Sequence, residues 1–182
     1  MLVERCDPGT QLARAMPPPE QDVVIAGLLR RLWRHPPAGH PFRPLHEMCD
    51  RWATEFAAKP APPDLDPGIA RAGISLLRSL PRDSVDDVLL CTDLHSENVL
   101  AAQRESWLVI DPKPYLGDRA YDVVQHLLNT DRLLDDPLAL ARRLAGLLDL
   151  DASRVRLWLF ARCVQQSASW PELTEVATRI AP

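Results

Sequence analysis

Three oxygen-bearing side chains, Asp93, Asn98 and Asp111, stand next to short apolar runs in the middle of the chain. A polar stretch separates the runs 98–101 and 107–110, which is typical of a β-hairpin. Because an antiparallel hairpin brings the start of one strand beside the end of the other, we expect Asn98 and Asp111 to lie side by side, with Asp93 just above them. Asn and Asp oxygens suit Mg²⁺, and a free carboxylate can orient an attacking hydroxyl and accept its proton. The pattern therefore predicts a magnesium-assisted phosphoryl transfer site.

The spacing of these residues supports this chemistry. Four residues separate Asp93 from Asn98, and Asp111 follows at the end of the next strand. Protein kinases place the same interval between a catalytic aspartate and a metal-binding asparagine, with a second metal-binding aspartate on the next strand. One such residue alone is ordinarily a turn or cap, but three together at this spacing favour the kinase interpretation. A metal-dependent hydrolase using Asp93, His95 and Asp111 is an alternative on residue types alone.

Longer stretches around these residues resemble a known family. Residues 92–100 look like the H-G-D-L-H-x-x-N-[VI]-L catalytic loop of aminoglycoside phosphotransferases. Residues 109–123 resemble the streptomycin 6-kinase and hydroxyurea phosphotransferase branch, in which D-P-K-P replaces the D-F-G of protein kinases. Residues 2–9 resemble the hinge between the two lobes of that branch. The resemblance thus covers nearly the whole chain.

The resemblance implies an ATP-dependent kinase that phosphorylates a hydroxyl of a small antibiotic, a streptomycin-like aminoglycoside. Asp93 would be the catalytic base, and Asn98 and Asp111 would hold Mg²⁺. The backbone from Glu4 to Cys6 would meet the adenine of ATP. The cofactors implied are therefore ATP and Mg²⁺, and the partner is a small molecule.

Other residues of the segment have supporting or open roles. By the resemblance, Asp122 would brace the catalytic loop from the following helix, and His95 would structure the loop. Asp118 is either a substrate contact or the N-cap of the helix near 121, and the cap is the preferred interpretation. Lys113 is interpreted as a surface or phosphate-proximal cation.

Two departures from the family pattern bear on activity. Cys91 and Thr92 stand where the family has His-Gly, and loss of the glycine is expected to strain the approach to Asp93. The seven glycines never form G-x-G, and Lys59 lies in a proline-rich loop, so a phosphate-covering loop and its lysine are missing from the sequence. We therefore expect this chain alone to bind ATP weakly and to turn over poorly. The alternative is a non-catalytic remnant that binds a partner or forms a homodimer covering the hinge face.

The elements that must position these residues are mainly helical. Apolar periodicity and proline breaks predict a short strand at the start of the chain, helices before and after the catalytic segment, and the hairpin between them. The expected elements are a strand at 1–6, helices from Glu20, at 45–57, 68–80, 121–134, 137–149, 153–168 and 171–180, and the hairpin. The fold class is α+β and protein kinase-like, a mainly helical C-lobe with a central β-hairpin and the N-lobe largely missing. One domain is expected over 1–182, with a hinge-like segment at 1–10 and the catalytic and metal-binding segment at 88–123.

Composition narrows the functional classes. A length of 182 residues is enough for one core, and no run of eighteen apolar residues predicts a membrane span. The net charge of −4 argues against nucleic acid and is compatible with a cationic substrate. No secretory signal is recognised, so the four separated cysteines are interpreted as reduced thiols in the cytoplasm.

Overall fold

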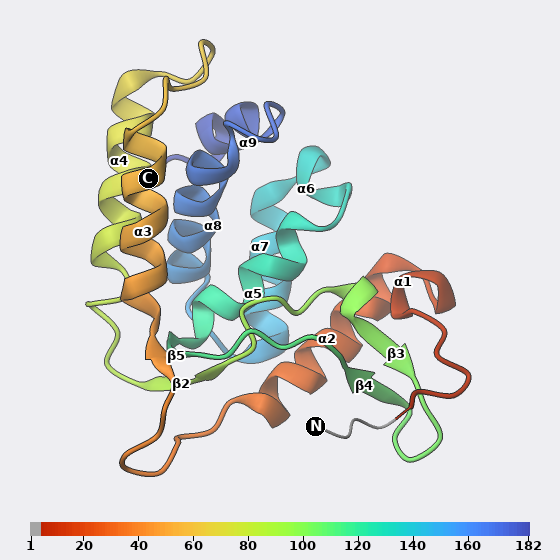
Figure 1. The fold of residues 1–182 in the computed structure, drawn as a ribbon. Coiled ribbons are helices and arrows are strands. Elements are labelled where there is room, and N and C mark those ends of the chain that lie inside the picture. The colour runs from red at the N-terminus through yellow and green to blue at the C-terminus, as the bar shows by residue number, and fades with distance from the viewer. Residues whose placement is uncertain (1–4) are drawn as a thin grey trace.

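The structure is a computed structural model that describes residues 5–182, most of which lie in helices (Figure 1). The helices of this part of the chain are α1 (Leu12–Ala15), α2 (Pro18–Leu32), α3 (Leu45–Ala57), α4 (Pro67–Ser79), α5 (Arg119–Leu128), α6 (Arg132–Asp135), α7 (Pro137–Leu148), α8 (Ala152–Gln166) and α9 (Leu173–Ile180), with a 3-10 turn at Ser96–Asn98. The strands are β1 (Arg43–Pro44), β2 (Asp87–Leu90), β3 (Val99–Ala101), β4 (Trp107–Val109) and β5 (Tyr115–Asp118).

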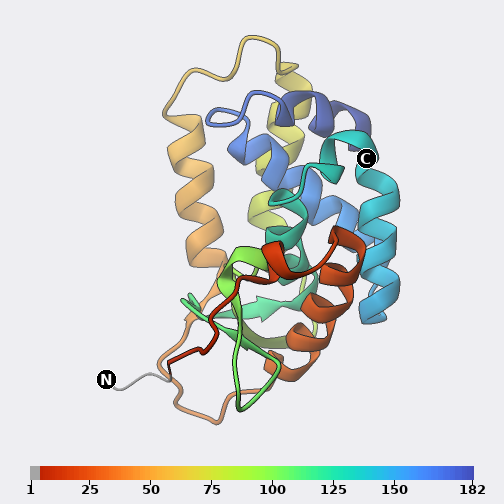
Figure 2. The same cartoon turned by 90° about the vertical axis from the view of Figure 1, so that its right-hand side faces the viewer.

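The strands form two small sheets that flank the candidate site. One sheet has the order β1-β5-β2, in which β1 runs parallel and β2 antiparallel to β5. The other is the predicted hairpin of β3 and β4, in which Val99 pairs with Val109. Figure 2 shows the N-terminal segment running beside this hairpin, where the Gly9 amide donates to the Ala101 carbonyl at 3.0 Å. Segment 87–118 therefore passes from the first sheet, through the 3-10 turn and the hairpin, and back to the first sheet.

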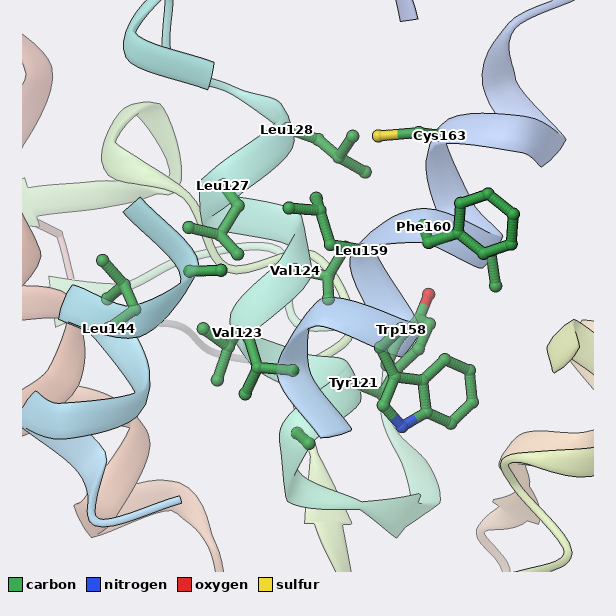
Figure 3. Close-up of a cluster of buried hydrophobic side chains, with 14 of the residues drawn as sticks. Tyr121, Val123, Val124, Leu127, Leu128, Leu144, Trp158, Leu159, Phe160 and Cys163 are labelled. Atoms are coloured by element: carbon green, nitrogen blue, oxygen red, sulfur yellow. The ribbon is translucent and has the colours of Figure 1, made fainter. Parts of the chain in front are cut away.

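Part of the core lies where α5 and α8 pack together (Figure 3). Tyr121 of α5 and Trp158 of α8 are almost fully buried, and their rings meet edge to face with centroids 5.1 Å apart. Helix α4 packs on the other side of α8 so closely that a Cβ atom at Gly73 would lie 2.5 Å from Val164. This packing fixes α5, the helix that starts directly after β5 and carries Asp122.

Side-chain caps explain where several helices begin. Asp66 accepts hydrogen bonds from the amides of Gly68 and Ile69, with Pro67 in the first turn of α4. Asp136 and Asp151 cap α7 and α8 in the same way. An N-cap carboxylate of this kind satisfies amides that the helix leaves unpaired and interacts favourably with the helix dipole.

The predicted elements agree with the structure over most of the chain, with a few differences. Helix α2 starts at Pro18 rather than Glu20, because proline lacks only an amide that the first turn leaves unused. The helix expected at 121–134 ends at Leu128, and a separate short helix, α6, follows. Helix α1 and strands β1 and β5 were not predicted. The predicted strand at 1–6 lies mostly outside the described residues, and residues 5 and 6 are irregular.

Among residues 5–182, no helix is both long and apolar enough to cross a lipid bilayer.

Candidate active site

The Asp122 carboxylate anchors the backbone of the loop that leads to Asp93. The Asp122 carboxylate is fully buried and accepts hydrogen bonds from the backbone amides of Cys91 and Thr92, at 3.0 and 2.7 Å. The indole of Trp33 donates to the same carboxylate at 3.1 Å. Burial raises the pKa of Asp122, against the lowering effect of these hydrogen bonds. One carboxylate thus joins α2, the loop and α5 immediately before Asp93.

Thr92 occupies a backbone conformation that normally favours glycine. Its φ of +54° lies in the left-handed region, which is unfavourable for a β-branched residue. The family pattern has glycine at this position, and the strain expected from its loss is present in the structure. The Thr92 hydroxyl donates to the Lys113 carbonyl, which ties the strained residue to the facing loop and offsets part of the cost.

The facing loop brings two predicted carboxylates around one lysine. The Lys113 ammonium forms an ion pair and hydrogen bond with the Asp93 carboxylate and lies 3.7 Å from that of Asp111. The Asp93 side chain is 17% exposed, whereas those of Asp111 and Lys113 are 70% and 58% exposed. The hydrogen bond from Lys113 to Asp93 raises the pKa of the lysine. Asp93 and Asp111 therefore lie on the same side of the loop, facing a common cation.

Asn98 lies against both the catalytic loop and the end of β4. Its side-chain amide donates to the Asp93 carbonyl at 3.0 Å, which leaves the amide oxygen as an available ligand. The Ile110 amide donates to the Asn98 carbonyl at 3.0 Å, so Asp111 directly follows the residue paired with Asn98. Asp111 itself has a φ of +50°, which aspartate tolerates better than most residues. An amide oxygen and an exposed carboxylate are hard donors, and together with water and phosphate oxygens they fit Mg²⁺.

The remaining predicted residues have different environments. His95 is half-buried, its Nδ1 atom has no hydrogen-bond partner among the described residues, and burial lowers the pKa of the ring. Its carbonyl accepts the Asn98 amide at 2.9 Å, so the backbone at this position shapes the 3-10 turn. Cys6 is half-buried in the N-terminal segment, and Glu4 lies outside the described residues.

Asp118 has the geometry of a cap rather than of a substrate contact. Its carboxylate accepts a hydrogen bond from the Ala120 amide at 2.9 Å, at the start of α5. Arg154 and the indole of Trp158 donate to its other oxygen, at 2.5 and 2.6 Å. With 6% of its surface exposed and both oxygens engaged by the protein, Asp118 has no group left for a ligand. Of the two interpretations of Asp118, substrate contact and N-cap, the geometry is that of the preferred N-cap.

A cavity of about 540 Å³ opens beside Asp93 on the side of α3 and α8. Its walls come from four parts of the chain: the catalytic loop, the loop 112–114, the first sheet and the inner faces of α3, α5 and α8. This volume suits a small molecule. Sequence reasoning missed most of its wall, in particular Arg43, Arg51 and Arg162, because residues on separate elements carry no readable spacing.

Sequence comparisons place the chain among antibiotic-modifying kinases. The family model described as aminoglycoside/hydroxyurea antibiotic resistance kinase matches residues 1–174. Streptomycin 6-kinase from Streptomyces griseus is 36% identical over 192 residues, covering 100% of this chain and 61% of the relative. Hydroxyurea phosphotransferase from Kitasatospora aureofaciens is 35% identical over 188 residues, covering 97% of this chain and 52% of the relative. The chain thus spans between half and two thirds of the length of these relatives.

Solved structures show the same fold at low sequence identity. Choline kinase LicA from Streptococcus pneumoniae superposes with a TM-score of 0.58 at 15% identity, covering 97% of this chain and 66% of that one. The structure of LicA in complex with AMP gives a TM-score of 0.59 at 14% identity, with the same coverage. The architecture is therefore kinase-like over almost the whole chain.

Proposed function

The chain belongs to the aminoglycoside/hydroxyurea antibiotic resistance kinase family, and from this premise we propose that it carries the catalytic segment of an ATP-dependent phosphotransferase. The proposed acceptor is a hydroxyl of a small, antibiotic-like molecule, and streptomycin is the acceptor that the relatives' names suggest. One observation carries the proposal. Asp93 lines a cavity of small-molecule size, while Asn98 and Lys113 contact it from the facing segments.

In the proposed mechanism, Asp93 acts on the acceptor. Its carboxylate orients the hydroxyl in the cavity and accepts the proton as the oxygen attacks the terminal phosphate. Lys113 holds the Asp93 carboxylate in place before the acceptor enters, through their ion pair and hydrogen bond. Asn98 and Asp111 would hold Mg²⁺, which supplies charge neutralisation for the phosphates. The contribution of the chain is mainly positioning and electrostatics.

Nucleotide binding in this proposal involves segment 5–10. Segment 5–10 runs beside the hairpin, which agrees with its interpretation as the hinge end of domain 1–182, with Cys6 near the adenine. The sequence contains no G-x-G, so nothing recognisable in it covers the phosphates. We therefore keep the proposal that the N-lobe is largely missing from this sequence and that the 182-residue chain alone turns over slowly.

Transfer of labelled phosphate from ATP tests the proposal. The chain is incubated with Mg²⁺, ATP and streptomycin, and Asp93→Asn serves as the test variant. Slow transfer that disappears in the variant supports the proposal. Release of phosphate from a monoester without ATP would instead support the metal-dependent hydrolase.

The alternative is a non-catalytic module that binds a partner or forms a homodimer over the face of segment 5–10. The missing G-x-G is the observation that favours it. This role predicts no phosphate transfer and a dimer by light scattering. A monomer with Asp93-dependent transfer would exclude it.

A further inference from the structure

The cavity beside Asp93 is strongly cationic, although the chain as a whole carries a net charge of −4. Among residues 5–182, four cationic side chains line it, and Asp93 is the one carboxylate in its wall. Asp93 is already paired with Lys113. The cations that remain are Arg43, Arg51 and Arg162.

Arg162 is buried without a carboxylate partner. Only 2% of its surface is exposed, and its Nε atom has no hydrogen-bond partner in the described part of the chain. It donates one hydrogen bond to the Tyr121 hydroxyl at 3.0 Å, and its guanidinium lies 4.1 Å from the ring centre of Trp52. Among residues 5–182 no acidic side chain forms an ion pair with it. Because a buried charge is costly unless it is paired, this arrangement favours a ligand that supplies the missing anion.

Two further arginines lie at the same cavity. The guanidinium of Arg43 stacks on the ring of Tyr115 at 4.9 Å, and within the described part of the chain it forms no ion pair. Arg51 contacts Glu55 on the same helix at 3.9 Å, an exposed pair of small energetic value. Both side chains are exposed enough to turn toward a bound molecule.

We propose that the acceptor carries an oxyanion, a carboxylate or phosphate group, that binds at Arg162 and Arg43 while its hydroxyl reaches Asp93. The inference rests on the proposed phosphotransferase function for the hydroxyl, but the anion subsite stands on the arginines alone. Guanidinium groups bind carboxylates and phosphates in a bidentate manner. A polycation such as streptomycin would meet like charges on this wall, so it is a poor fit for the cavity.

The subsite is tested first by binding, without catalysis. Inorganic phosphate is titrated calorimetrically into the 182-residue chain, with ionic strength held constant by sodium chloride. Arg162→Gln and Arg43→Gln are the test variants. Arg30→Gln, on an exposed face of α2 away from the cavity, is the matched control. We expect each test variant to weaken phosphate binding about tenfold or more, because it removes a charge-assisted contact, and the control to change it less than twofold.

Arg43 is exposed, so its variant keeps the test valid if Arg162→Gln unfolds. Phosphate binding that is undetectable in the unmodified chain, or that is unchanged in Arg43→Gln and in a folded Arg162→Gln, would overturn the subsite. Streptomycin binding strengthened by either variant would support it.

A transfer assay then separates the two proposals. Streptomycin and a panel of hydroxy acids are compared as acceptors, and we expect the hydroxy acids to be preferred. Phosphate binding without transfer to any acceptor would contradict the proposed phosphotransferase function but would still support the anion subsite. If the rate of transfer to streptomycin is the same in both arginine variants as in the unmodified chain, the anion subsite is contradicted and the phosphotransferase function is supported.

Discussion

At the scale of single residues, Asp122 controls the geometry of the catalytic loop. Its two oxygens accept three hydrogen bonds, and asparagine would turn a donor toward at least one of those three donors. We expect Asp122→Asn to lower the free energy of unfolding by about 2–3 kcal/mol, because a buried polar group is left unsatisfied. Denaturant titration followed by circular dichroism measures this. A loss below about 0.5 kcal/mol would show that the loop does not depend on the carboxylate.

Under the proposed function Asp93 has the opposite character, because its carboxylate would serve the transfer reaction rather than stability. Its partner Lys113 is more than half exposed, so the lysine returns to water when the carboxylate is removed. We expect Asp93→Asn to lower the transfer rate about 10²- to 10⁴-fold, the usual contribution of a general base. Unfolding measurements should detect little change. Asp64→Asn, in an exposed loop, is the control and should keep the full rate.

At the scale of elements, the close approach of α4 and α8 depends on Gly73. A Cβ atom there would lie 2.5 to 2.7 Å from three atoms of the buried Val164. We expect Gly73→Ala to destabilise the protein by about 1–3 kcal/mol through overpacking. Gly146→Ala, on an exposed face of α7 with nothing within 4 Å, should instead stabilise it by about 0.5–1 kcal/mol. Thermal unfolding measures the change in stability of both variants. A change in the same direction in Gly73→Ala and Gly146→Ala would contradict the packing argument.

The helices and strands also show which parts of the fold could be predicted from the sequence. Helix α3 begins and ends at the predicted residues, because Leu45, Met48 and Trp52 repeat at helical spacing after a proline. The hairpin was predicted from its two apolar runs and their polar connection. Strand β5 was not predicted, because its pairing with β2 and β1 is non-local and Gly117-Asp118 looks like a turn. Gly117 is needed there because a Cβ atom would lie 2.6 Å from Leu45, a contact that no local pattern reveals.

The candidate site, like the fold, could be predicted only in part from the sequence. The spacing of Asp93, Asn98 and Asp111 could be read from the sequence, because they lie on one short segment. Residues that complete the cavity could not, since Arg43, Trp52 and Arg162 come from three elements that only the tertiary fold brings together. The ring of Trp52 packs against the guanidinium of Arg162, a contact between two helices that the sequence pattern does not reveal.

At the scale of the whole molecule, one buried carboxylate joins four helices. Asp22 of α2 is fully buried and contacts His126 of α5, Arg132 of α6 and Arg143 of α7 at 2.7 to 3.1 Å. Burial alone would raise the pKa of Asp22, but the hydrogen bonds from His126, Arg143 and Arg132 hold it below its ordinary value. Because folding favours the ionised form, the carboxylate contributes stability above its unfolded pKa of about 4, and this contribution is lost as the pH falls through the lower folded pKa.

Replacement of Asp22 should therefore have a pH-dependent effect. At neutral pH we expect Asp22→Asn to lower the free energy of unfolding by about 3 kcal/mol, because the cations of α6 and α7 lose their buried partner. Below about pH 4 the difference from the unmodified chain should shrink, since protonation removes the same charge from Asp22. Asp50→Asn is the control, because its pair with Arg82 is exposed and should contribute less than about 1 kcal/mol. Denaturant unfolding between pH 3 and 7 measures both variants, and a difference at Asp22 that stays constant across this range would show that its charge does not hold the four helices together.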